Sequence, residues 1–264
     1  MPKPIFEPRE GETFSIVHPA IYYASSGLLK QLAAGGPAAS DAVARLTAAL
    51  ENYPYHFEGA LALATLHTVA GDLEKACNVR YRACQHILDL LPDDEEEECN
   101  LDWEARENQA AMELLHASAI DHVLIGDFEL AAALFETLLE FDPEDHFEAS
   151  KTLVFCYIAL EERELFNLTL GDLDEKSAER AVAGLWGTFR FTGKIDPEQF
   201  AALHRHLPEV FAEFRGETHE PGETYLAEIE SDRPSRMIQA RRLWLQTEPF
   251  WMEFSDFIPA LKQA

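Results

Sequence analysis

Apolar residues recur every three or four positions along most of the chain, and short polar breaks separate these runs. This spacing is typical of amphipathic helices, and no stretch alternates at a period of two for long enough to indicate a sheet. The pattern predicts an all-α fold. Helices are expected near residues 103–125, 146–160, 162–170, 175–191 and 197–206.

Two of the polar breaks share one pattern, Gly71-Asp72 in the first and Gly126-Asp127 in the second. Glycine adopts the left-handed backbone conformation that ends a helix, and aspartate caps the free amide groups that begin the next one. Each break is therefore expected to fold two helices back on each other as an antiparallel pair.

A small residue, Ala76 or Ala131, follows each glycine by five positions and lets the paired helices approach closely. An earlier, weaker copy has its turn at Gly35-Gly36-Pro37, about one 34-residue period before Gly71. The sequence therefore contains three copies of one helix-turn-helix pattern.

Extra residues separate the second copy from the third. Most of them belong to the acidic run 93–98, whose like charges repel one another and favour solvent. Asp102 is then expected to cap the long helix that follows.

The three copies resemble the tetratricopeptide repeat family, whose pattern runs Trp, Leu-Gly, Tyr, a turn Gly, Ala, Phe, Ala and Pro. The matching positions are Leu29, Ala42, Leu46, Ala49 and Pro54 in the first copy, Leu63, Gly71, Ala76 and Ala83 in the second, and Gly126, Ala131, Phe135, Leu138 and Pro143 in the third. The chain departs from the family Trp at Ser26, Ala60 and Leu115, and from the family Tyr at Ala33, His67 and His122. The resemblance covers about residues 22–143.

The resemblance implies a right-handed α-solenoid of antiparallel helix pairs with additional C-terminal helices. On this basis the expected organisation is an N-terminal extended segment (1–18), a repeat region (19–170), further helices that continue the solenoid (171–215), and an acidic linker followed by an Arg- and aromatic-rich helical segment (216–264).

The resemblance also implies a binding groove, because the first helix of each pair lines the concave side of such a stack. The residues that the repeat frame places there are Gln31, Glu58, Thr65, Thr68, Glu113 and His116. The Lys, Arg and Asn residues with which some family members hold a C-terminal carboxylate are missing from this face. The groove therefore either binds a partner of another kind or is covered by the chain's own C-terminal segment.

Charge separates that segment from the rest of the chain. The formal net charge is -27, yet basic residues outnumber acidic ones from Arg233 onward. Arginine and aromatic side chains supply much of the binding energy at protein interfaces. The candidate interface residues are Arg241, Arg242, Trp244, Phe250, Trp251 and Phe254. Packing of this segment on the chain's own helices, recruitment of a partner and self-association all remain open.

The acidic charge repels nucleic-acid phosphates and anionic lipid headgroups, and it suits a basic partner. It can equally serve only to keep the protein in solution. The chain lacks any apolar stretch long enough to span a bilayer, and its cysteines are few, so a cytoplasmic protein with reduced thiols is expected.

Signals for chemistry are sparse. Glu113 and His116 have the i, i+3 spacing of helical di-iron sites, but the sequence holds only one such pair, so neither a metal nor a cofactor is expected. The sequence also lacks a nucleophile elbow, a phosphate-binding glycine loop and a dinucleotide fingerprint. The leading interpretation is a non-enzymatic adaptor that binds a protein or peptide. The alternatives are a self-associating structural protein and, third, a metal-dependent helical-bundle enzyme.

Overall fold

The computed structural model describes residues 2–9, 13–20, 22, 39–91 and 99–264. This part of the chain is mostly helical, as the apolar spacing predicts, and contains one two-stranded sheet. Two compact units are formed, Met1–Asp121 with Ala133–Phe147 and His122–Ala132 with Glu148–Ala264. Each unit is described by itself.

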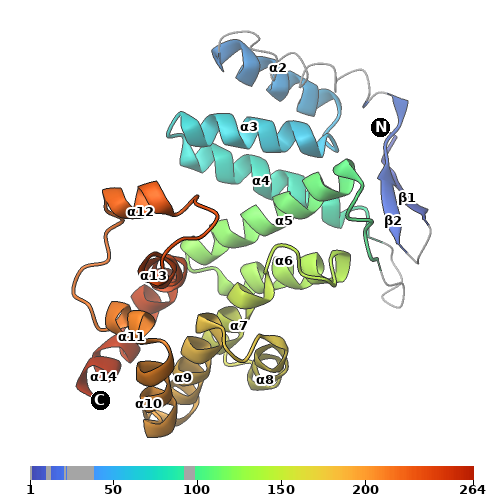
Figure 1. Ribbon diagram of the computed structural model, residues 1–264. Helices are drawn as coiled ribbons and strands as arrows, with labels where there is room; N and C mark the ends of the chain where they lie inside the picture. The colour runs from blue at the N-terminus through green and yellow to red at the C-terminus, as the bar shows by residue number, and fades with distance from the viewer. Residues whose placement is uncertain (1, 10–12, 21, 23–38, 92–98) are drawn as a thin grey trace. The chain divides into compact units, whose positions relative to one another are not determined.

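The described helices make up most of the described residues of both units (Figure 1). They are α2 (Ala39–Asn52), α3 (Phe57–Val69), α4 (Leu73–Leu88), α5 (Arg106–Leu124), α6 (Phe128–Phe141), α7 (Ser150–Ala159), α8 (Arg163–Asp172), α9 (Ala178–Thr192), α10 (Pro197–His206), α11 (Pro208–Phe214), α12 (Glu223–Glu228), α13 (Arg236–Glu253) and α14 (Phe257–Gln263).

Both predicted Gly-Asp breaks end one helix and begin another. Gly71 and Gly126 each have φ of +79°, the left-handed conformation that was expected of them. The following amides of Asp72 and Asp127 donate to the carbonyl oxygens of His67 and His122, both at 2.9 Å. This six-to-one hydrogen bond closes the last turn of a helix. The two predicted helix breaks are confirmed.

The two aspartates differ in how they begin the next helix. The Asp127 side chain accepts a hydrogen bond from the Leu130 amide at 3.3 Å, as a capping residue does. Asp72 makes no such bond, and its carboxylate lies 3.0 Å from Lys75 Nζ instead. The capping role expected of aspartate is therefore found at one of the two turns.

A third turn of the same geometry lies between α7 and α8. Glu161 has φ of +61°, and the Glu162 amide donates to the Tyr157 carbonyl at 2.9 Å. The sequence pattern predicts helices on both sides of this point but gives no signal for a left-handed residue, because glutamate stands where the other two turns have glycine. A third helix pair thus follows the same plan.

The first unit also holds a β-hairpin that the sequence pattern does not predict. Strands β1 (Ile5–Pro8) and β2 (Phe14–Val17) pair antiparallel, with Ile5 opposite Val17. Four-residue strands contain too few alternations to stand out from a coil. Asn108, which is fully buried on α5, accepts from the Ile16 amide at 2.8 Å and donates to the Phe14 carbonyl at 2.8 Å. One side chain therefore attaches β2 to α5.

The core of the second unit is built largely from aromatic rings. Phe155 on α7 lies 6.1 Å from Trp186 on α9 and 5.7 Å from Phe250 on α13, measured between ring centroids. Trp251 and Phe257 complete this cluster around Trp186. The C-terminal helices thus pack on α7 and α9 of their own unit.

Several predicted features lie outside the described residues. They are Ser26, Leu29, Gln31, Ala33, the turn at 35–37 and the acidic run 93–98. Asp102 accepts a hydrogen bond from the Glu104 amide at 3.0 Å, but α5 begins only at Arg106. Asp102 therefore orders the turn before the helix.

Candidate functional site

The groove positions predicted on α3 lie at the surface or near it. Glu58 is mostly buried, accepts a hydrogen bond from Tyr22 Oη at 3.1 Å and forms an ion pair with Arg106 at the start of α5. Thr65 and Thr68 are exposed, and their hydroxyls donate to carbonyl oxygens of α3 itself. Thr65 and Thr68 are therefore the α3 positions of this set that present side chains to solvent.

The two groove positions predicted on α5 have different surroundings. Glu113 is exposed, whereas His116 lies against the rings of Phe135 and Phe147, with centroids 6.0 and 5.4 Å away. Burial lowers the pKa of His116, so its imidazole is held neutral near pH 7. Among the described groove residues none bonds directly to another, and one ion pair links Glu58 of α3 to Arg106 of α5.

An aromatic and acidic cluster that the sequence interpretation missed lies beside His116. The Trp103 indole stacks on the His146 imidazole at 4.0 Å, and Phe147 meets Trp103 edge-on. His146 Nδ1 lies 2.6 Å from the buried carboxylate of Asp142, which raises the pKa of His146. Tertiary folding brings Trp103 to the loop after α6, so neighbouring sequence carried no signal for the cluster.

The predicted C-terminal interface is largely internal. Trp244, Phe250 and Trp251 are each 5% exposed or less, and Phe254 lies over Phe128 at 6.1 Å. These rings pack against other residues of the second unit. This packing agrees with the alternative in which the segment packs on the chain's own helices.

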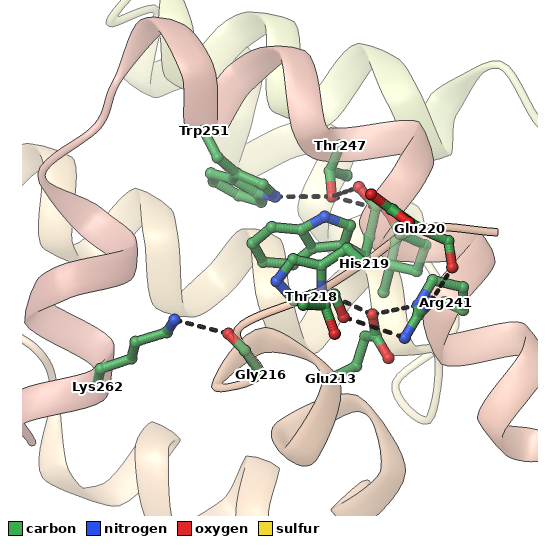
Figure 2. Close-up of polar contacts among 11 residues, drawn as sticks. Glu213, Gly216, Thr218, His219, Glu220, Arg241, Thr247, Trp251 and Lys262 are labelled. Atoms are coloured by element: carbon green, nitrogen blue, oxygen red, sulfur yellow. Dashed lines mark hydrogen bonds and ion pairs between the residues drawn. The ribbon is translucent and has the colours of Figure 1, made fainter. Parts of the chain in front are cut away.

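Arg241 is also used inside the second unit, where it holds the segment between α11 and α12 (Figure 2). Its guanidinium donates to the Glu213 carboxylate at 2.5 Å and to the backbone carbonyls of Glu220 and Thr218 at 2.6 and 3.3 Å. His219 Nδ1 lies 2.8 Å from the same carboxylate oxygen of Glu213. The Glu213 carboxylate thus contacts two basic side chains.

The neighbours of this network hold the same segment at two further points. The His219 ring stacks on Trp244 at 3.6 Å, and Lys262 Nζ donates to the Gly216 carbonyl at 2.6 Å. Figure 2 shows that Lys262 approaches this segment from one side and Arg241 from the other. The predicted acidic linker is therefore bonded to the helices around it over residues 216–220.

Arg242 differs from its neighbour because its side chain is exposed. Arg233 and Arg236 are exposed as well, and within the described chain none of the three takes part in a hydrogen bond or ion pair. Within the predicted interface set, Arg242 is therefore the exposed arginine, and Arg233 and Arg236 add exposed positive charge from outside that set.

A surface cavity of about 550 Å³ lies in the first unit between α2, α3 and α4. Ala60, Leu63 and His67 contribute from α3, and the other walls come from α2 with its following turn and from α4. The sequence interpretation placed no site here. The sequence held one signal for this cavity. Ala60, which lines it, is a small residue where the tetratricopeptide pattern has Trp.

Two further properties bear on possible chemistry. In the described residues no cluster of three or more His, Cys, Asp or Glu side chains has the arrangement of a metal site. Cys84 donates to the Leu114 carbonyl, and burial raises the pKa of this thiol to about 12, which keeps it protonated and unreactive.

Within the described part of the chain, no helix has both the length and the apolar character required to cross a bilayer. Comparison with known proteins finds no protein family, no curated protein and no solved structure that matches this chain.

Proposed function

We propose that this chain is a non-enzymatic scaffold, an adaptor that binds a protein or peptide through the first helices of stacked helix pairs. The observation that supports the proposal best is the recurrence of one turn, at Gly71, Gly126 and Glu161, with the same left-handed residue and the same closing hydrogen bond. Turns repeated in this way are what a right-handed solenoid of tetratricopeptide type requires, since each pair must leave its turn in the same direction.

The exposed polar positions on α3 and α5 are the surface that we assign to the partner. Glu113 is an exposed carboxylate without a bond in the described chain, and Thr65 and Thr68 are exposed on α3. By contrast, α7 is covered within the second unit, because Phe155 packs against Phe250 and Trp251 of α13. The C-terminal segment thus acts as a cap, and the groove that remains is polar and acidic.

A groove of this character suits a basic segment of a cytoplasmic partner, because the whole chain carries a formal charge of -27. Lysine and arginine side chains would pair with Glu113, and the threonine hydroxyls would accept further hydrogen bonds. Binding of this kind depends on charge and weakens as salt is added.

The test uses the full chain as bait and Glu113→Lys as the altered bait. The expected result is a stoichiometric partner whose affinity falls about fivefold or more on charge reversal, as loss of an ion pair together with a new repulsion requires. Glu140→Lys is the matched control, since Glu140 is an exposed glutamate on α6 outside the predicted groove. Equal capture by the wild-type chain and Glu113→Lys would exclude this surface.

Self-association is the second candidate function, and the exposed arginines at 233, 236 and 242 favour it. Their charge is opposite to that of most of the surface, so the segment of one copy suits the acidic helices of another. Light scattering at low and high salt distinguishes the two functions. A mass that falls toward that of the monomer at high salt supports self-association, and a monomer at every concentration and salt rejects it.

A further inference from the structure

The cavity between α2, α3 and α4 combines an apolar interior with a basic rim. Its volume is about 550 Å³, which is in the range of small-molecule sites. The apolar part of its lining is Leu50, Pro54, Ala60, Leu63, Val79 and Ala83. Ala60 and Ala83 are buried and small, so the helices leave a hollow where larger side chains would fill the space.

One face of α4 supplies the basic rim. Lys75 and Arg82 lie seven residues apart, which places them on the same side of a helix, and both line the cavity with Asn78 between them. Arg82 is exposed and has no hydrogen bond or ion pair in the described chain. Its guanidinium is therefore available to an anion.

The acids near the cavity offset part of these charges and leave Arg82 without a direct ion-pair partner in the described chain. Glu51 is the acid among the lining residues, and it is exposed on α2. Asp72 lies 3.0 Å from Lys75 Nζ and 3.9 Å from His67 Nδ1, so it neutralises part of the charge of Lys75. Arg82 and Glu51 line the cavity without an ion pair between them, and His67 and His86 add imidazole nitrogens that can donate hydrogen bonds.

This local charge runs against the composition of the chain, in which 48 acidic residues face 21 lysines and arginines. The chain as a whole has more than two acids for each base, whereas the cavity has two bases against Glu51 in its lining and Asp72 beside Lys75. The arrangement favours a ligand that is itself negatively charged and has an apolar portion to fill the interior.

We infer that this cavity is a binding site for a small amphipathic anion, with its carboxylate, phosphate or sulfonate group at Arg82 and Lys75 and its apolar body against Leu63 and Val79. Arginine recognises such groups through paired, charge-assisted hydrogen bonds. The site is independent of the proposed protein-binding groove, because none of its lining residues belongs to the predicted groove set.

The test is a fluorescence titration of the full chain with 8-anilino-1-naphthalenesulfonate, which carries a sulfonate on an apolar body. We expect saturable binding at one site. N-phenyl-1-naphthylamine, the analogue without the sulfonate, should bind about tenfold or more weakly, because it forgoes the charge-assisted hydrogen bonds.

The variant Lys75→Gln/Arg82→Gln removes the two cations and should bind the sulfonate probe about tenfold or more weakly than the wild type. The matched control is Lys194→Gln/Arg205→Gln, which removes the same charge from exposed residues of the second unit and should bind as the wild type does. A second variant, Thr47→Trp, places an indole at the wall of the cavity and should abolish binding by steric exclusion.

Circular dichroism of each variant establishes that the fold is intact before the titrations are compared. Loss of affinity in both cavity variants with retention in the control supports the site. Unchanged affinity in Lys75→Gln/Arg82→Gln, or equal binding of the neutral analogue, overturns the proposal. If the double variant does not fold, unchanged binding by Thr47→Trp is sufficient to overturn the proposal.

Discussion

The ring of Phe166 on α8 lies directly over Gly187 on α9. A Cβ added to Gly187 would come within 2.5 Å of Phe166 Cζ, closer than two carbon atoms can approach. Phe166 follows Glu161 by five positions, which is where Ala76 and Ala131 follow the glycines of the other two turns. The large side chain at this position is thus accommodated by a glycine on the next helix.

This contact predicts opposite effects of alanine at two glycines of the same helix. Gly187→Ala should destabilise the protein by about 1–3 kcal/mol, because the new methyl group overpacks the core. Gly184→Ala should stabilise it by about 0.5–1 kcal/mol, since alanine is the better helix former and the nearest atom, Leu170 Cδ2, is 4.0 Å away. Chemical denaturation of both variants measures the difference, and two changes of the same sign would contradict the close contact.

The left-handed turn at Glu161 predicts that glycine is the better residue there. A left-handed backbone costs a residue with a side chain about 1–2 kcal/mol, so Glu161→Gly should stabilise the protein by about 1 kcal/mol. The lost ion pair between Glu161 and Arg190 offsets little of this gain, because the Glu161 side chain is 66% exposed.

The converse substitution at another turn is the control. Gly126→Ala should destabilise by about 1 kcal/mol, although a Cβ there would meet no atom within 4 Å, because only the backbone conformation opposes it. Thermal and denaturant unfolding measure both variants. A loss of stability in Glu161→Gly would show that its side chain, and not its backbone, matters.

The carboxylate of Glu213 predicts a weak point in the second unit. Its side chain is 8% exposed and pairs with both His219 and Arg241. Glu213→Gln removes the charge from this buried network and should cost about 2–3 kcal/mol. Because Arg241 holds the carbonyls of Thr218 and Glu220, the adjoining segment should also open more often.

Limited proteolysis with chymotrypsin reports this opening, since Tyr225 lies in α12 just after the bonded segment. We expect cleavage near Tyr225 to be several times faster in Glu213→Gln. Glu217→Gln is the control, because Glu217 is 87% exposed and its pairing with Lys262 at 3.3 Å contributes little. Equal cleavage rates in the two variants would mean that the buried carboxylate does not secure the segment.

Buried histidines predict that the first unit loses stability in acid. His18 is 5% exposed, stacks on Tyr22 and shares a hydrogen bond with Tyr53 Oη at 3.0 Å. Burial, with the nearby His56 imidazole, lowers the pKa of His18 from 6.5 to about 4. His18 is therefore protonated below about pH 6.5 in the unfolded chain, but only below about pH 4 in the folded chain.

This difference in proton uptake makes the folded state less stable as the pH falls. Stability from neutral His18 is fully present above pH 6.5 and falls as the pH drops toward 4, by about 3 kcal/mol in all. The pKa of His56 is lowered by burial in the same way and adds to the slope. The free energy of unfolding measured against pH should therefore decline more steeply in wild type than in His18→Asn, and parallel curves would contradict the assignment.

Much of the helical plan of this protein was determined by its sequence alone. The breaks at Gly71 and Gly126 and the helices from α7 to α10 were predictable because their signals are local: a left-handed glycine, a turn residue and an apolar period all act within a few positions. Local signals do not depend on which parts of the chain later meet.

Only the tertiary structure decided the rest. Trp244, Phe250 and Trp251 have the composition of an interface, yet they are buried within their own unit. Phe250 and Trp251 pack against rings of α7 and α9, and Trp244 packs against Phe214 of α11. The turn at Glu161 forms without glycine because helices packed on both sides compensate for its backbone energy, and no pattern in neighbouring residues records that packing.

The cavity is another feature that local sequence patterns do not predict. Ala60 and Ala83 are ordinary small residues in the sequence, and they leave a hollow only because α2, α3 and α4 meet there. The fold decides which of the many charged side chains of an acidic chain face that hollow. Local periodicity thus determined where helices begin and end, and long-range packing decided which surfaces remain for a ligand.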